Sequence, residues 1–337
     1  MAPTACEPVL VTRRLPQEVL ARIAGACDLD LWQGTGAMPR GELLRHAAGK
    51  TGLVTLLTDR IDEELLAAAG PDLRIVANYA VGYDNIDVAA CSARGILVAN
   101  TPDVLTETSA DMAWALMLAA TRRICEGDRL VRSGQPWFWD PGMLLGWDLH
   151  HKVLGLVGFG RIGQAVARRA QGFGMRVVYA SRRAAPAEID RAVGVQRVPL
   201  ADLLADADFV SLHVPLTPET RHLISADELR RMKPGAVLVN TSRGAVVDEA
   251  ALAAALGAGE IFAAGLDVYE REPEVLPALL SLPNVVLAPH LGSASIETRL
   301  AMGMMAADNL LAALSGRRPP TLVNPEVWDA RSHAEPR

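Results

Sequence analysis

The chain has 337 residues, 50% of them hydrophobic, and a formal net charge of −6. This length and composition allow two domains with separate hydrophobic cores. Positive side chains are interspersed among acids and form no basic cluster, which argues against a nucleic-acid partner. Residues 1–15 lack the pattern of a secretory signal, and no apolar run is long enough to span a bilayer, so we expect a cytoplasmic protein with no membrane partner.

The cysteines give no sign of a metal site or a disulfide framework. They are Cys6, Cys27, Cys91 and Cys125, and none of them forms a CxxC pair. Scattered cysteines of this kind favour free thiols. We therefore expect no bound metal.

Short apolar segments alternate with helical patterns in residues 1–100. Strands are predicted at residues 9–12, 29–32, 53–57, 73–77 and 96–99, and helices at residues 16–24, 40–48 and 62–69. This alternation is typical of a parallel sheet wound by right-handed crossovers.

A second block of the same kind follows, with strands beginning near residues 153, 176, 209, 236, 262 and 285. Before it lies a helix whose body, residues 112–121, is apolar nearly all round. Such a helix must be covered on several sides, so we expect it at a domain junction or a subunit interface. A last helix, residues 296–314, is predicted to cross back to the first block. The fold class is therefore α/β, with two doubly wound parallel-sheet domains, at residues 1–100 with 288–337 and at residues 101–287.

A glycine-rich turn connects an apolar strand, residues 153–157, to an amphipathic helix. The turn comprises Gly158, Phe159, Gly160, Arg161, Ile162 and Gly163. The first glycine permits a tight turn, the second lets backbone N–H groups approach a pyrophosphate, and the third lets the helix pack closely on the strand. The pattern predicts a dinucleotide cofactor; an ordinary glycine-rich turn is the alternative.

The residues after the next strand indicate which dinucleotide. A carboxylate at this position would hydrogen-bond the ribose 2′-hydroxyl of NAD, but the chain has Ser181, Arg182 and Arg183 there. A hydroxyl and two guanidinium groups suit a 2′-phosphate instead. We predict that NADP(H) is preferred and that NAD(H) is possible. The alternative is that both arginines are solvated loop charges.

Polar side chains follow three later strands of the second block. They are Arg243, Asp267, Glu272 and His290. Taken singly, Arg243 could cap a helix, Glu272 could lie on the surface and His290 could be a satisfied loop histidine. Because parallel strands present their carboxyl ends at one edge of a sheet, we expect these side chains to supply an acid, its orienting carboxylate and an anion clamp beside the glycine turn.

These blocks together resemble the D-2-hydroxyacid dehydrogenase family, and within it the glyoxylate and hydroxypyruvate reductases. The resemblance runs over nearly the whole chain, through segments such as ANYAVGYDNID, VGFGRIGQAVARRA, NTSRGAVVDE, GLDVYEREP, NVVLAPHLGSAS and PPTLVNPEV. It implies a Rossmann dinucleotide-binding domain and a smaller, discontinuous, flavodoxin-like substrate domain.

The resemblance also implies roles for single residues. Arg243, Glu272 and His290 would be the catalytic set, and backbone amides around Val81 and Gly82 would bind the substrate carboxylate. Asp267 would hold the nicotinamide carboxamide. Further positions implied to contact the cofactor are Val214, Pro215, Thr220, Thr241 and Gly292.

The chemistry of reducing a 2-oxo acid calls for these residue types. Negative charge develops on the carbonyl oxygen, and His290 can donate the proton that it needs. Glu272 would fix the tautomer of His290. Arg243 can fork onto the substrate carboxylate and polarise the carbonyl.

The aromatic segment Trp137, Phe138, Trp139 bears on substrate size and assembly. By resemblance, Trp139 matches an aromatic residue that reaches into the active site of a partner in a homodimer, which would favour small substrates such as glyoxylate or hydroxypyruvate. The alternative is a hydrophobic plug in the dimer contact.

Other functions on the same fold stay open. They are another 2-hydroxyacid or phosphite dehydrogenase, and a dinucleotide-sensing protein similar to the C-terminal-binding corepressors. Formate dehydrogenases resemble this family with Gln at the position of Glu272, so the carboxylate counts against them.

Overall fold

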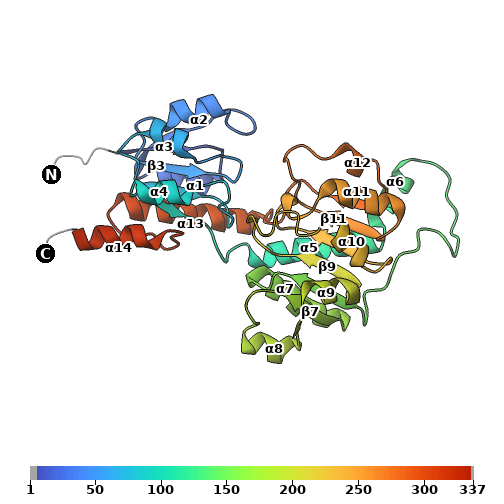
Figure 1. Ribbon diagram of the computed structural model, residues 1–337. Coiled ribbons are helices and arrows are strands. Elements are labelled where there is room, and N and C mark those ends of the chain that lie inside the picture. The colour runs from blue at the N-terminus through green and yellow to red at the C-terminus, as the bar shows by residue number, and fades with distance from the viewer. Residues whose placement is uncertain (1–5, 335–337) are drawn as a thin grey trace. The chain divides into compact units, whose positions relative to one another are not determined.

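The computed structural model describes the backbone of residues 6–334 and the side chains up to residue 330. The chain forms two compact units, unit 1 with residues 1–105 and 294–337 and unit 2 with residues 106–293 (Figure 1). The chain passes from one unit to the other after residues 105 and 293. From the sequence, these domain boundaries are predicted after residues 100 and 287.

Unit 1 is built on a parallel sheet of five strands in the order β2-β1-β3-β4-β5. The strands are β1 (Glu7–Val11), β2 (Cys27–Leu31), β3 (Gly52–Thr55), β4 (Ile75–Asn78) and β5 (Leu97–Ala99). This is the flavodoxin-like order, with a change of winding direction between β1 and β3. Strands β3, β4 and β5 are buried along their whole length, as expected for a sheet covered by helices on both faces.

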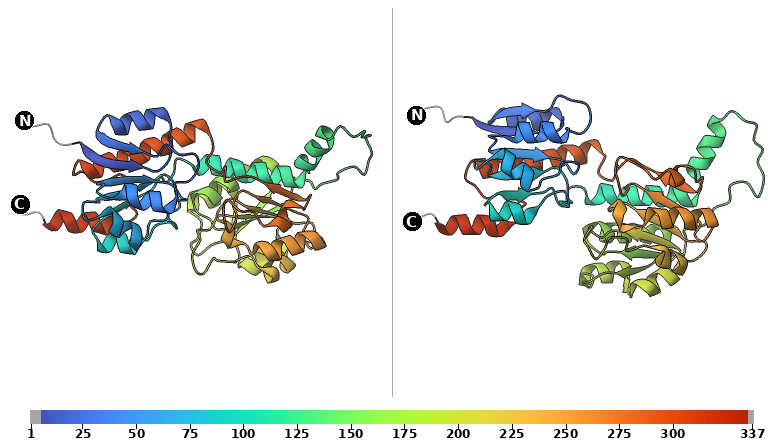
Figure 2. Two further views of the ribbon diagram at one scale, coloured as in Figure 1. Left: turned by 90° about the horizontal axis from the view of Figure 1, so that it is seen from above. Right: turned by 45° about the horizontal axis from the view of Figure 1, so that its top comes forward.

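The helices of unit 1 come from both ends of the chain. They are α1 (Gln17–Ala24), α2 (Arg40–Ala47), α3 (Glu63–Ala69), α4 (Val88–Ala93), α13 (Ile296–Leu314) and α14 (Pro325–Ala334). Helix α13 has the predicted bounds and packs against β4 and α1 (Figure 2). A Cβ on Gly303 would lie 2.5 Å from Cγ2 of Val19, so the two helices touch at this glycine.

Unit 2 contains a parallel sheet of seven strands in the order β12-β11-β10-β9-β6-β7-β8. The strands are β6 (Val153–Val157), β7 (Arg176–Ala180), β8 (Gln196–Arg197), β9 (Phe209–Leu212), β10 (Val237–Asn240), β11 (Ala263–Leu266) and β12 (Val285–Leu287). The winding reverses between β6 and β9, which is the Rossmann arrangement and the place where such sheets bind ligands. The α/β fold class is thus confirmed.

The helices of unit 2 are α5 (Thr106–Thr121), α6 (Ile124–Arg132), α7 (Arg161–Ala170), α8 (Ala187–Val193), α9 (Leu200–Asp206), α10 (Ala226–Arg231), α11 (Glu249–Ala258) and α12 (Pro277–Leu280). Helix α5 packs on α7, β10 and β11, and a Cβ on Gly265 would lie 2.9 Å from Cβ of Leu116. Unit 2 itself therefore supplies much of the cover that the apolar body of α5 requires, and the helix begins at the first residue of this unit.

Two features are absent from the part of the chain that the structure describes. No helix there is long and apolar enough to cross a membrane, and no cluster of His, Cys, Asp or Glu there could hold a metal ion. The four cysteines are free.

Candidate active site

The glycine turn between β6 and α7 has the geometry that a dinucleotide requires. Gly158 has a φ of +93°, and a Cβ at this position would lie 2.5 Å from the carbonyl oxygen of His213. A Cβ on Gly163 would lie 2.6 Å from the carbonyl oxygen of Gly158, so α7 packs directly on the turn. A Cβ on Gly160 would have nothing within 4 Å, which leaves room over the turn for a ligand.

Two rings beside this turn, those of Phe159 and His213, carry no charge at neutral pH. Phe159 is buried and stacks on Tyr179 of β7 with ring centroids 4.2 Å apart. Burial lowers the pKa of His213 to about 4, so its ring is uncharged at neutral pH, and Nε2 lies 2.9 Å from Oγ of Ser211. Positive charge beside Gly160 comes from the N-terminal end of the α7 dipole and from the exposed side chain of Arg161, the first residue of that helix.

The end of β7 leads into an exposed basic loop. Arg182 and Arg183 are exposed and Ser181 is half-buried. The guanidinium group of Arg197 donates to the carbonyl oxygens of Ser181 at 2.9 Å and of Arg182 at 2.8 Å. A side chain of β8 therefore hydrogen-bonds the backbone of this loop. The loop offers donors and positive charge, but no carboxylate.

Glu272 and His290 form a hydrogen-bonded pair in unit 2. Oε2 of Glu272 lies 2.8 Å from Nδ1 of His290, and Oε1 accepts the N–H of Tyr269 at 3.0 Å. Each of the two side chains is 25% exposed. Because Nδ1 faces the carboxylate, Nε2 is the ring nitrogen that points away from this pair.

The carboxyl of Glu272 stays ionised in this setting. Burial acts to raise its pKa, but the hydrogen bond and charge of His290, with the N–H of Tyr269, lower it below its usual value. A charged Glu272 therefore accepts the Nδ1–H of His290 at neutral pH.

Arg243 is placed by the turn that follows β10. The side chain of Asn240 donates to the carbonyl oxygen of Arg243 at 2.9 Å and accepts the N–H of Ser242 at 3.0 Å. Nη1 of Arg243 donates to the carbonyl oxygen of Ser242 at 2.8 Å, and the charge of Arg243 acts to lower the pKa of Glu272. Arg243 thus belongs to the same charged group as the pair.

Asp267 anchors the loop that carries His290. Its side chain is 1% exposed, and its two carboxylate oxygens accept the N–H groups of Leu291 at 2.6 Å and Gly292 at 2.7 Å. Its carbonyl oxygen accepts the N–H of His290 at 2.8 Å. His290 has a φ of +57°, a left-handed conformation that costs free energy for a non-glycine residue and that these hydrogen bonds maintain.

Two further segments predicted to contact the cofactor also lie in unit 2. Thr220 donates from Oγ1 to the carbonyl oxygen of Pro215 at 2.7 Å, which closes the turn after Val214. Oγ1 of Thr241 is buried and has no hydrogen-bond partner among the described residues. A buried hydroxyl without a partner beside β10 is consistent with a polar ligand atom at that position.

The loop with Val81 and Gly82 lies in unit 1, where it follows β4. Asn78 donates to the carbonyl oxygen of Gly82 at 2.9 Å, and Asn100 donates to that of Val81 at 2.8 Å. Asn78 in turn accepts from the hydroxyl of Thr55 at 3.1 Å. Two asparagine side chains therefore fix the orientation of both peptide groups.

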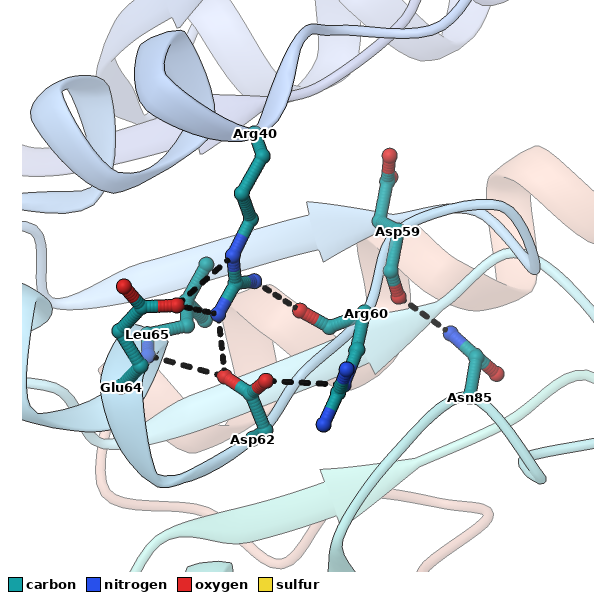
Figure 3. Close-up of polar contacts among 7 residues, drawn as sticks. All are labelled: Arg40, Asp59, Arg60, Asp62, Glu64, Leu65 and Asn85. Atoms are coloured by element: carbon teal, nitrogen blue, oxygen red, sulfur yellow. Dashed lines mark hydrogen bonds and ion pairs between the residues drawn. The ribbon is translucent and has the colours of Figure 1, made fainter.

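A polar cluster holds the neighbouring loop between β3 and α3 (Figure 3). Asn85 donates to the carbonyl oxygens of Asp59 at 2.9 Å and Leu56 at 3.1 Å. Arg40 pairs with Asp62, the residue that caps α3, and donates from Nη1 to the carbonyl oxygen of Arg60 at 2.6 Å. The carboxyl edge of the unit 1 sheet is thus rigidly braced.

Trp139 lies in a segment that projects from unit 2. Residues 133–149 form a long excursion after α6 (Figure 2), and Phe138 and Trp139 are 81% and 79% exposed. Helix α6 itself has no buried residue and exposes Ile124 and Val131. We call α6 with residues 133–149 the arm.

Comparison with known proteins assigns the chain to a family. Residues 114–292 match the family model described as D-isomer specific 2-hydroxyacid dehydrogenase, NAD binding domain. The chain belongs to this dehydrogenase family. It is therefore an NAD(P)-dependent dehydrogenase.

Individual relatives of this dehydrogenase are similar over nearly the full length. A glyoxylate reductase from Korarchaeum cryptofilum is 54% identical over 330 residues, covering 96% of this chain and 97% of the relative. One from Thermococcus litoralis is 52% identical over 324 residues, covering 95% and 97%. Among solved structures, an NADPH-dependent glyoxylate/hydroxypyruvate reductase from Sinorhizobium meliloti in complex with NADP and malonate has a TM-score of 0.81 and 37% identity, covering 95% of this chain and 97% of that one.

Sequence reasoning missed several polar residues of the dehydrogenase. His222 pairs with Glu270, with Nε2 2.8 Å from Oε1, although no partner is evident for it in the sequence. Asn78 and Asn85, which hydrogen-bond the loops of unit 1, were also missed. The position of Asn78 at the end of a strand was the one available sign, because side chains at that edge face the ligand side of such sheets.

Proposed function

We propose that this dehydrogenase reduces small 2-oxo acids, with glyoxylate and hydroxypyruvate as substrates, and that it prefers NADPH to NADH. The observation that carries the proposal is the hydrogen-bonded pair of Glu272 and His290 in one charged group with Arg243, in the unit that holds the glycine turn. The names of the archaeal relatives support glyoxylate as the substrate.

The residues divide the reaction between them. The nicotinamide, when bound, supplies the hydride that reaches the carbonyl carbon. His290 donates the proton from Nε2 to the carbonyl oxygen, so that the product is the 2-hydroxy acid. Glu272 holds the ring by Nδ1 and stabilises the imidazolium before the transfer.

Substrate binding calls for donors to a carboxylate. Arg243 forks onto the substrate carboxylate and polarises the carbonyl group. In unit 1, Val81 and Gly82 offer backbone amides that suit a carboxylate. The N–H of Gly82 shares a peptide group with the carbonyl that Asn100 holds. The N–H of Val81 shares one with the carbonyl of Ala80, which accepts the N–H of Thr101 at 2.9 Å. These bonds orient both amides, which supports the role.

Cofactor binding rests on the turn and the basic loop. Residues Gly158 to Gly163 receive the pyrophosphate, and Ser181, Arg182 and Arg183 receive the 2′-phosphate. The lack of a carboxylate in the loop after β7 supports NADPH, as does the NADPH dependence of the relative from Sinorhizobium meliloti. Asp267, Thr241, Thr220, Val214, Pro215 and Gly292 complete the proposed cofactor site.

A substrate panel tests the proposal. Initial rates of NADPH and NADH consumption are measured with glyoxylate, hydroxypyruvate, pyruvate and a longer 2-oxo acid, and NAD(P)⁺ reduction is measured with phosphite. We expect the highest kcat/KM for glyoxylate or hydroxypyruvate with NADPH. A preference for the longer acid or for phosphite, or equal use of both cofactors, would contradict it.

A further inference from the structure

The loop that carries Glu272 is held by a second group of charged side chains, which the proposed reaction does not use. Oε1 of Glu270 lies 2.8 Å from Nε2 of His222 and accepts the N–H of Glu249 at 3.4 Å. In return, Oε1 of Glu249 accepts the N–H of Glu270 at 2.7 Å. Oε2 of Glu270 lies 3.6 Å from Nη2 of Arg221. We call Glu249, Glu270 and His222 the clasp.

The clasp joins three segments that are distant in the sequence. Glu249 is the first residue of α11 and follows the Arg243 turn, whereas Glu270 stands two residues before Glu272. His222 comes from the segment before α10, has a φ of +50°, and donates its N–H to the carbonyl oxygen of Ala245 at 2.8 Å. The three segments therefore cannot shift independently.

The Arg243 turn and the Glu272 loop also touch directly through their backbones. A Cβ on Gly244 would lie 1.8 Å from the carbonyl carbon of Tyr269 and 2.3 Å from the nitrogen of Glu270. Only glycine fits here without moving one of the two segments. The peptide between Tyr269 and Glu270 thus lies against the residue next to Arg243, while the N–H of Tyr269 holds Glu272.

Stabilising the fold with the clasp costs desolvation free energy. Glu249 is buried, and burial together with the negative charges of Glu270 and Glu272 raises its pKa, although the N–H of Glu270 acts in the opposite direction. Buried carboxylates cost desolvation free energy, and apolar packing could stabilise the fold equally well. What carboxylates add is directional hydrogen bonding, which fixes a geometry.

We propose that Glu270, with Glu249 and His222, is a positioning group that sets the separation between Arg243 and Glu272. The proposal rests on the functions assigned above to those two residues. It adds to those functions the group that keeps Arg243, the anion clamp, at a fixed distance from Glu272, the partner of His290. Displacements of about 1 Å in such an arrangement cost on the order of 100-fold in rate.

Steady-state kinetics of two variants test the role of Glu270. In Glu270→Ala, both acceptor bonds are lost, and we expect kcat to fall about 10- to 100-fold while the Kd for NADPH stays within about 2-fold of wild type. In Glu270→Gln, the amide oxygen still accepts from His222 and Glu249, so most of kcat should return. Asp206→Ala, which removes an exposed ion pair with Arg176 in the same unit, is the matched control.

Hydrogen exchange gives a second readout that needs no substrate. The amides of Tyr269 and Glu270 are the donors to Glu272 and Glu249, so a peptide spanning residues 266–274 should exchange faster in Glu270→Ala but not in Glu270→Gln or Asp206→Ala. If wild type fails to reduce glyoxylate, the proposed function fails, and the exchange data alone decide on the clasp. Unchanged exchange in Glu270→Ala, wild-type kcat in that variant, or a Gln variant as impaired as the Ala variant would overturn the positioning role.

Discussion

At the scale of single residues, the candidate site contains one histidine in a left-handed backbone conformation. His290 has a left-handed φ of +57°, and three hydrogen bonds to Asp267 from residues 290–292 maintain it. This backbone geometry fixes the direction in which the ring of His290 leaves the chain, and it is the feature that the proposed proton-donor role would use.

Removing this imidazole should abolish proton transfer while leaving cofactor binding intact. We expect His290→Ala to lower kcat by about 10²- to 10⁴-fold, the usual contribution of a general acid, with an unchanged Kd for NADPH. The measurement is kcat from initial rates, with Kd from cofactor fluorescence. His46→Ala is the control, since His46 forms a similar pair with Asp30 in unit 1, at 3.0 Å. A turnover near that of wild type in His290→Ala would rule out the general-acid role.

Arg243 offers a second test at this scale. Lysine carries the same charge but cannot fork onto a carboxylate and a carbonyl group together. We expect Arg243→Lys to lose on the order of 100-fold in kcat/KM, close to the loss in Arg243→Ala. Arg176→Lys, at an exposed ion pair, should behave as wild type. Recovery of kcat/KM by lysine would show that charge alone is required.

At the scale of elements, we expect the loop after β7 to determine which dinucleotide is preferred. It presents Arg182 and Arg183 to solvent, and Arg197 of β8 holds its backbone. Charge-assisted hydrogen bonds to a phosphate contribute about 1.5 to 3 kcal/mol each, which corresponds to roughly 10-fold or more per arginine. We expect Arg182→Ala with Arg183→Ala to raise the KM for NADPH by about 100-fold and to leave the KM for NADH nearly unchanged.

The control for this loop is Arg191→Ala, because Arg191 is exposed on the neighbouring helix α8 and lies outside the loop. Its two KM values should match those of wild type. Equal losses for NADPH and NADH in the double variant would mean that the arginines are solvated charges after all.

Sequence patterns predicted elements with strong local signals, but not every element that packs in the core: helices α9 and α11 have buried residues and were not predicted individually. Helix α13 was predicted with its bounds, and β6 with the turn after it, because apolar periodicity and glycine spacing are local signals. Strand β8 has two exposed residues and shows no such pattern. The pairing of His222 with Glu270, 48 residues away, depends on a left-handed backbone at His222 that the sequence does not indicate.

At the scale of the whole molecule, the arm exposes apolar surface that a monomer rarely keeps. Ile124 and Val131 on α6, with Phe138 and Trp139 beyond it, are all exposed in a chain that is only 4% aromatic. Exposed apolar patches of this kind mark interaction sites. We propose that the arms of two copies cover each other in a homodimer, with Trp139 reaching the partner's active site.

Replacing the aromatic side chains of the arm should therefore break the assembly without unfolding either unit. We expect wild type to be a dimer by light scattering, and the double variant Phe138→Ser with Trp139→Ser to be a monomer with unchanged circular dichroism. Leu280→Ser on α12, where the side chain is also exposed, is the control and should remain dimeric. Trp139→Ala alone should keep the dimer but gain activity on longer 2-oxo acids, because the space that it occupies would open. A monomeric wild type would contradict the proposed homodimer. If Trp139→Ala is dimeric and its substrate preference is unchanged, Trp139 contributes only to the dimer contact and does not limit substrate size.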